Sequence, residues 1–155
     1  MLFRSSAEMQ NYILSHCLKD AVQETMNKIE KIIEECVRKF YSEYSPILYE
    51  RTYQLLHSYI KVNAIRSGNG YEAEIYFDAG TMNHAVKNLD TGDSFSNSGW
   101  SEETILETAL AGSAPHGGWP PAGGNGIWND VLPLINGQVI NWLKAELIAN
   151  GLPVR

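Results

Sequence analysis

The sequence predicts an α+β fold in which a long N-terminal helix packs on a small antiparallel sheet, with a short helix and a C-terminal helix. Apolar residues recur at steps of three and four over residues 14–40, which is the period of one face of an α-helix. From Ile60 the period changes to two on both sides of Gly68-Asn69-Gly70, which indicates a hairpin. A chain of 155 residues encloses one core, so we expect a single domain over residues 1–155.

The first helix is expected over residues 6–43. Ser5 and Glu8 have the spacing of a capping box, which satisfies the first free amides of a helix. No glycine or proline occurs before Pro46 to interrupt it. Its apolar stripe consists of Leu14, Leu18, Val22, Met26, Ile29, Ile33, Cys36 or Val37, and Phe40.

The length of this helix bears on assembly. At about 1.5 Å per residue it would be about 55 Å long, whereas a compact domain of this size is about 40 Å across. Either the helix breaks, or it projects with Leu14 and Leu18 exposed until a neighbouring subunit covers them. We favour association, which makes both leucines candidate interface residues.

Ser45 and Pro46 suit the start of a short helix over residues 45–58, because proline is favoured at the first helical position. Residues 59–100 are expected to hold antiparallel strands and loops. A helix over residues 101–111 begins with two glutamates, which the positive end of the helix dipole favours.

A long loop is expected over residues 112–128. Residues 112–126 contain six glycines and three prolines, which exclude a regular element. The C-terminal helix is then expected over residues 129–150, weakened at Gly137 and ended by Gly151.

Composition indicates a soluble globular protein. Hydrophobic residues make up 44% and charged residues 19% of the chain. No apolar run approaches the roughly 18 residues of a membrane span, and the N-terminus has no apolar stretch typical of a secretory signal. We therefore expect a cytosolic protein with no membrane partner.

The charge is unevenly distributed. The net charge of −6 disfavours a general nucleic-acid grip, which needs clustered lysine and arginine. Residues 67–110 hold Lys87 as their one basic residue against eight acidic residues. This segment is either a solvated strand face followed by an acidic helix start, or an acidic surface that faces a basic partner or passing DNA. The candidate acidic surface consists of Glu72, Glu74, Asp78, Asp90 and Asp93.

The two cysteines are expected to be core residues. Cys17 and Cys36 would lie roughly 28 Å apart on a continuous helix, far beyond the reach of a disulfide. The sequence has no Cys-x-x-Cys or Cys/His cluster that would indicate zinc.

The familiar catalytic motifs are absent from the sequence, so we expect no enzyme, no cofactor and no metal site. His116 and Asp130 would be an imaginable acid–base pair beside the loop, but nothing places a nucleophile near them. A hydrolase that uses His116 is therefore a weak alternative.

Aromatic residues in the loop are the stronger feature. A glycine-rich segment begins at His116 and bears Trp119 and Trp128. Buried tryptophan is a frequent interface anchor, so this loop is a candidate arm that inserts into a neighbouring subunit. The alternative is that both indole rings fold back on their own core.

The segment Tyr44-Ser45-Pro46-Ile47-Leu48-Tyr49-Glu50-Arg51-Thr52-Tyr53-Gln54-Leu55-Leu56 resembles a signature of lambdoid-type siphophage minor structural proteins. These are the tail-completion or head–tail joining proteins of phages and prophages of Firmicutes. The His116-Gly117-Gly118 loop before a final helix is similar as well. The resemblance extends over most of the chain and is sharpest between Tyr41 and Tyr53.

The resemblance implies a non-catalytic protein of the phage neck that forms a ring, often a hexamer. Its implied partners are further copies of itself, the head connector, and the tail tube or tail terminator protein, with transient non-specific passage of DNA. It implies a host cytoplasmic location during assembly and then a place in the virion. The matching positions add Tyr49, Arg51 and Tyr53 to the candidate interface residues Leu14, Leu18, His116, Trp119 and Trp128.

Two alternatives of other classes stay open. One is a phage-encoded inhibitor whose acidic surface mimics DNA and blocks a host defence protein. The other is a bacterial scaffold or adaptor that dimerises through its first helix.

Overall fold

The computed structural model describes residues 3–42, 54–81, 85–87, 94–96, 102–111, 126–152 and 154. The chain divides into two compact units, and each unit is built from stretches that lie far apart in the sequence. Unit 1 combines Met1–Lys31, Lys61–Ile75 and Ile135–Arg155, and unit 2 combines Ile32–Ile60 and Tyr76–Leu134.

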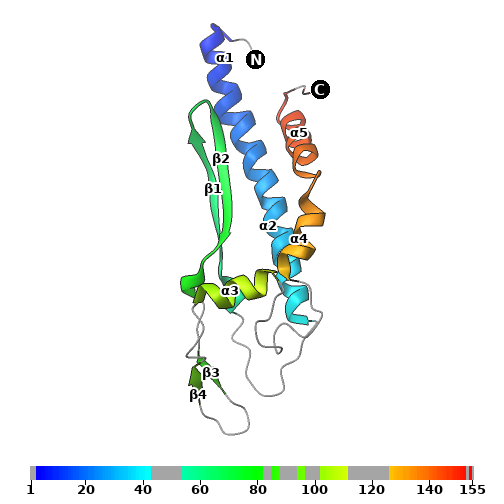
Figure 1. Ribbon diagram of the computed structural model, residues 1–155. Coiled ribbons are helices and arrows are strands. Elements are labelled where there is room, and N and C mark those ends of the chain that lie inside the picture. Colours follow the sequence, from blue (N-terminus) through cyan, green and yellow to red (C-terminus); the bar gives the residue numbers. More distant parts are fainter. Residues whose placement is uncertain are drawn as a thin grey trace. The chain divides into compact units, whose positions relative to one another are not determined.

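The N-terminal segment is helical from Ser6 to Ser42. Figure 1 shows α1 (Ser6–Tyr12) and α2 (Lys19–Ser42) as successive parts of one helical rod, joined by η1 (Ile13–Leu18). The predicted N-cap is confirmed, because the Ser5 side chain accepts a hydrogen bond from the Glu8 amide at 3.1 Å. The Glu8 carboxylate accepts from the Arg4 amide at 2.7 Å, which satisfies a second free donor.

The helix changes its winding at η1, which is a π-helix. A π-turn accommodates an extra residue and shifts the faces that precede and follow it. The fully buried residues of unit 1 on this rod are the small Cys17, Ala21 and Thr25, while Leu14 and Leu18 are half-buried. Small side chains at steps of four allow neighbouring elements to approach the helix axis closely.

Thr25 carries a buried hydroxyl whose stability effect can be measured. The residue is 5% exposed, and its Oγ1 finds no hydrogen-bond partner among the described residues. A buried polar group without a partner carries a desolvation penalty of about 1–3 kcal/mol, and valine has the same shape without the hydroxyl. We expect Thr25→Val to raise the free energy of unfolding by about 1 kcal/mol in urea denaturation. Thr25→Ser is the control: it keeps the hydroxyl and loses a methyl group, so it should destabilise the protein.

The hairpin predicted around Gly68-Asn69-Gly70 is formed by β1 (Tyr59–Ser67) and β2 (Gly70–Phe77). Gly68 has a φ of +55°, the left-handed conformation that tight hairpin turns require. Along β2, Ala73 and Ile75 are half-buried while Glu72 and Glu74 are exposed. The predicted alternation is therefore present, with the acidic positions outward.

Unit 2 contains several short elements. They are η2 (Gln54–His57), η3 (Ala79–Thr81), α3 (Glu102–Ala111), and the short antiparallel pair β3 (Ala85–Lys87) and β4 (Ser94–Ser96). Of the helix predicted over 45–58, the structure describes residues 54–58, and Gln54–His57 form a 3-10 turn there. The core of unit 2 consists of Ile33, Cys36, Val37, Phe40, Leu55, Leu106, Ala109, Ile127 and Val131.

The C-terminal helix expected over residues 129–150 is divided in two. The structure has α4 (Ile127–Ile135) and α5 (Val139–Ala149). Gly137 between them has a φ of +77°, which a continuous right-handed helix cannot accommodate. Pro133 inside α4 also lacks an amide proton for the helical ladder. Helix α5 ends before Gly151 as predicted, where φ is +88°.

The predicted α+β class is confirmed, with a long N-terminal helix, a two-stranded antiparallel sheet and short C-terminal helices. In the part of the chain that the structure describes, no helix combines the length and apolarity needed to cross a bilayer.

Candidate interaction surface

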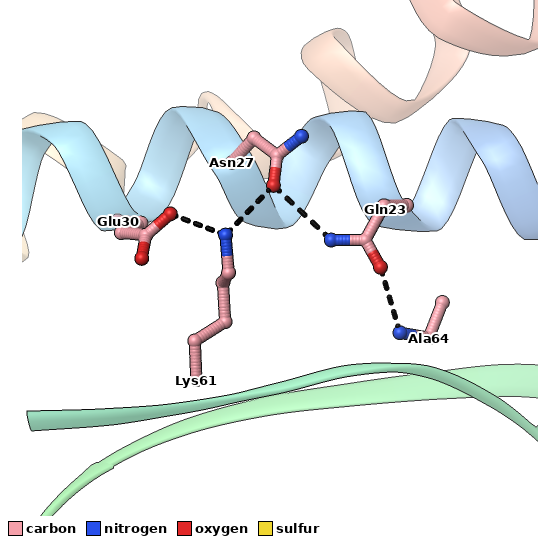
Figure 2. A network of polar contacts seen from close by, with 5 residues as sticks. All are labelled: Gln23, Asn27, Glu30, Lys61 and Ala64. Atoms are coloured by element: carbon pink, nitrogen blue, oxygen red, sulfur yellow. Dashed lines mark hydrogen bonds and ion pairs between the residues drawn. The ribbon is translucent and has the colours of Figure 1, made fainter.

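A polar network attaches the hairpin to α2 within unit 1. Figure 2 shows Gln23, Asn27 and Glu30 on one row of α2, facing β1. The Lys61 ammonium donates to Asn27 Oδ1 at 3.1 Å and forms an ion pair with Glu30. The Gln23 amide donates to the same Asn27 oxygen at 3.1 Å.

The network also satisfies the backbone of β1. The Ala64 amide donates to Gln23 Oε1 at 2.9 Å, and Ala64 is buried. An unpaired amide on a strand edge is a template for unwanted pairing, and a buried one is destabilising. Gln23 therefore fixes β1 against α2, because it accepts a hydrogen bond from a backbone amide that β2 does not bind.

A second set of contacts attaches α5 to the same rod. Lys28 Nζ lies 2.6 Å from Glu146 Oε1, and the Cys17 thiol donates to the Asn150 carbonyl at 3.2 Å. Cys17 and Lys28 are eleven residues apart, so they share one side of the rod. That side differs from the row of Gln23, Asn27 and Glu30.

The hairpin leaves an open face in unit 1, which we call the hairpin face: Asn63, Ile65, Glu72 and Glu74. All four residues are exposed and occupy alternate strand positions, which places them on the side away from the half-buried Ala73 and Ile75. Ile65 is 52% exposed and is the large apolar residue among these four. The hairpin face therefore combines two carboxylates with an apolar side chain.

Helix α5 also has an uncovered side, which we call the α5 outer face: Ile140, Lys144, Ala145, Ile148 and Ala149. Ile140 is 61% exposed and Ile148 is 56% exposed. The opposite side carries Trp142, Leu143 and Leu147, all half-buried, and no residue of α5 is fully buried. A helix that is apolar on all sides is usually covered on all sides.

The predicted interface residues that the structure describes lie in both units. Leu14 and Leu18 are half-buried in η1. Trp128 lies in unit 2, where its ring meets Phe77 edge-to-face with centroids 5.7 Å apart. Phe77 in turn packs edge-to-face on Tyr59 at 6.2 Å. The other predicted interface residues, Tyr49, Arg51, Tyr53, His116 and Trp119, lie outside the described residues.

Of the predicted acidic surface, Glu72 and Glu74 are exposed on β2. Asp78 is half-buried, and its Oδ1 accepts the Gly80 amide at 2.9 Å, so this carboxylate stabilises a turn. Asp90 and Asp93 lie outside the described residues. Within the acidic segment, Glu72 and Glu74 therefore remain exposed, whereas Asp78 stabilises a turn.

A serine and a histidine also meet at the surface of η1. Ser15 Oγ lies 2.7 Å from His16 Nδ1 and donates to the Asn11 carbonyl at 2.7 Å. A serine hydroxyl that bonds the carbonyl four residues earlier is a common local arrangement in helices. Among the described residues, no three His, Cys, Asp or Glu side chains gather as metal ligands do.

Both cysteines are free and buried, as predicted from their spacing. Burial raises the pKa of the Cys36 thiol above its ordinary value of 9.0; Asp130 raises it further, while Lys39 lowers it. The folded state therefore disfavours the thiolate, so the stability that Cys36 contributes is complete below about pH 9 and is lost as pH rises through the folded pKa.

We expect the difference in unfolding free energy between the wild type and Cys36→Ala to shrink as pH is raised above about 9. Denaturant titrations at several pH values measure this difference. Alkylation at pH 8 followed by peptide mass spectrometry should show slower labelling of Cys36 in the folded than in the unfolded protein. Equal rates would contradict the burial argument.

Comparison with known proteins places the chain in a family. No curated protein and no solved structure matches it. A family model named YomN matches residues 5–121, which is most of the chain and includes both the Tyr41–Tyr53 segment and the His116-Gly117-Gly118 loop. The family agrees with the predicted phage origin, while membership among tail-completion proteins stays a prediction. The chain belongs to the YomN family, which is associated with Bacillus phages and prophage regions.

Proposed function

We propose that this protein is a structural component of a phage neck or tail, a ring-forming tail-completion or head–tail joining protein that acts in virion assembly. The observation that carries the proposal is α5, which has apolar residues on all sides and no fully buried residue. Such a helix needs a protein neighbour, because exposed apolar surface of this kind marks association sites. The phage-associated family supports a virion as the place of that association.

Unit 2 supplies a second reason to expect neighbours. On α4, Leu132 is 44% exposed and Leu134 is 52% exposed. Each unit therefore has large exposed apolar side chains of its own. A protein that contacts further copies of itself and the head connector or tail tube needs several such surfaces. Its location would be the host cytoplasm during assembly and the virion afterwards.

The experiment is deletion of the gene from an inducible phage or prophage. We expect lysates that contain full heads and separate tails under the electron microscope, with infectivity restored when the protein is supplied in trans. Mass spectrometry of purified complemented virions should detect the protein. Normal infectious particles without it would refute a joining role.

A second candidate is an acidic inhibitor that mimics DNA and occupies a host defence protein. The exposed pair Glu72 and Glu74 favours it, because a DNA mimic presents carboxylates where DNA presents phosphates. A sizing column with light scattering distinguishes the two proposals. The joining protein should form higher oligomers or bind tails, whereas the mimic should remain small and retain a basic host protein.

A further inference from the structure

We propose that the α5 outer face of one copy docks on the hairpin face of the next copy, so that subunits join head to tail. The inference deepens the proposed function by naming the contact through which a ring would form. Both faces belong to unit 1, so a single unit presents both halves of the contact.

The two faces match in their apolar residues. Ile140 and Ile148 are exposed by 61% and 56% and lie on one side of α5, about 12 Å apart along the axis. Ile65 on the hairpin face is 52% exposed. Ala145 lies beside this row, and its small side chain would let the hairpin face approach the helix closely. The contact would remove three large apolar side chains from water.

Charge favours pairing of the α5 outer face with the hairpin face over pairing of either face with itself. Lys144 is exposed between Ile140 and Ile148, and Glu72 and Glu74 are exposed about 7 Å apart on β2. If two α5 outer faces paired around a two-fold axis, the two lysines would meet near its centre. If two hairpin faces paired, glutamates would meet glutamates. The unlike pairing places Lys144 against carboxylates and is the one that attraction favours.

The attachment of both elements to α2 keeps the two faces available at once. The hairpin is held by Gln23, Asn27 and Glu30, whereas α5 is held by Cys17 and Lys28 on another side of the rod. One copy can therefore use its α5 outer face toward one neighbour and its hairpin face toward another. Such a heterologous contact yields a closed ring when its rotation closes.

The test is a charge exchange in the full-length protein, followed by sedimentation velocity over a range of concentrations. Lys144→Glu and the double variant Glu72→Lys/Glu74→Lys should each weaken self-association at least tenfold. A mixture of the two should associate again, because the altered faces complement each other and the unaltered faces still match. Lys31→Glu and Glu24→Lys, exposed sites on α2, are the matched controls and should leave association unchanged.

Ile148→Asp tests the apolar part and should also weaken association at least tenfold. Circular dichroism and the thermal midpoint show whether each variant remains folded. Wild-type association that neither charge exchange weakens, or a mixture that fails to recover, overturns the proposed contact. Recovery on mixing Lys144→Glu with wild type alone would instead indicate pairing between two α5 outer faces.

These outcomes are separate from the genetic test of function. If the protein is required for joining heads to tails but remains monomeric in solution, the inferred contact fails and the joining role stands. If it associates through these faces but virions form normally without it, the joining role fails and the contact stands.

Discussion

Replacing Trp128 with alanine is expected to lower the free energy of unfolding by about 3 kcal/mol. Truncation of a core aromatic residue destabilises by about 3–5 kcal/mol, and half-buried Trp128 belongs at the lower end. Its ring meets Phe77 at an interplanar angle of 87°, an edge-to-face arrangement worth about 0.5–1.5 kcal/mol beyond area burial. Urea unfolding followed by circular dichroism measures the change without relying on the lost fluorophore.

The control is Trp128→Phe, which retains an aromatic ring beside Phe77 and should destabilise by less than about half as much. The pair of variants also tests the predicted role of Trp128 as an interface anchor. If Trp128 serves chiefly a neighbouring subunit, alanine at this position will weaken association and leave the unfolding of the isolated chain unchanged.

Replacing Lys61 with methionine is expected to destabilise the protein by about 2 kcal/mol. The substitution keeps the apolar part of the side chain. It removes the ammonium that forms an ion pair with Glu30 and donates a hydrogen bond to Asn27. The side chains of Lys61 and Glu30 are only 22% and 26% exposed, so the remaining carboxylate would be largely desolvated without its cation. The midpoint of urea unfolding should fall with little change in slope.

A double-mutant cycle isolates the pair. Glu30→Gln in the Lys61→Met background should add much less destabilisation than it does alone, giving a coupling energy of about 1 kcal/mol. The matched control is Arg38 and Glu34, an exposed pair four residues apart with side chains 61% and 38% exposed. The same cycle there should give about 0.3–0.5 kcal/mol. Equal coupling at both sites would mean that burial does not strengthen the Lys61 pair.

Local sequence patterns predicted the regular elements well. The step of three and four residues indicated a helix over 6–43, and helical structure is present from Ser6 to Ser42. Alternation around Gly68 indicated the hairpin, and Gly68 has the positive φ that its turn requires. These features depend on contacts between residues close in sequence, so composition and spacing are sufficient to specify them.

The same patterns did not predict how Gly137 divides the C-terminal segment. An isolated glycine in a helical pattern only weakens a helix, and its choice of a positive φ depends on what surrounds it. Asn27 and Lys28 lie outside the predicted apolar stripe of the first helix. The structure uses both residues to attach other elements to the rod.

Gln23 shows why such residues escape sequence analysis. It carries no charge and lies outside the apolar stripe, and its partner, the Ala64 amide, is 41 residues away. A polar residue at a helical position gives the same sequence pattern whether its side chain faces water or a strand. The only signal in the sequence is the spacing of Gln23, Asn27 and Glu30 on one row, which is common on solvated helices.

By itself, the sequence determined the α+β class, the long helix, the hairpin, the buried cysteines and the acidic character of β2, because each follows from periodicity or charge along the chain. Only the tertiary structure decided that Gln23 and Lys61 hold the hairpin to α2, that α5 is separate from α4, and that Ile65, Ile140 and Ile148 stay exposed. Exposure is a property of what the rest of the fold covers. An isoleucine has the same periodic position in a sequence whether a neighbouring element reaches it or leaves it in water.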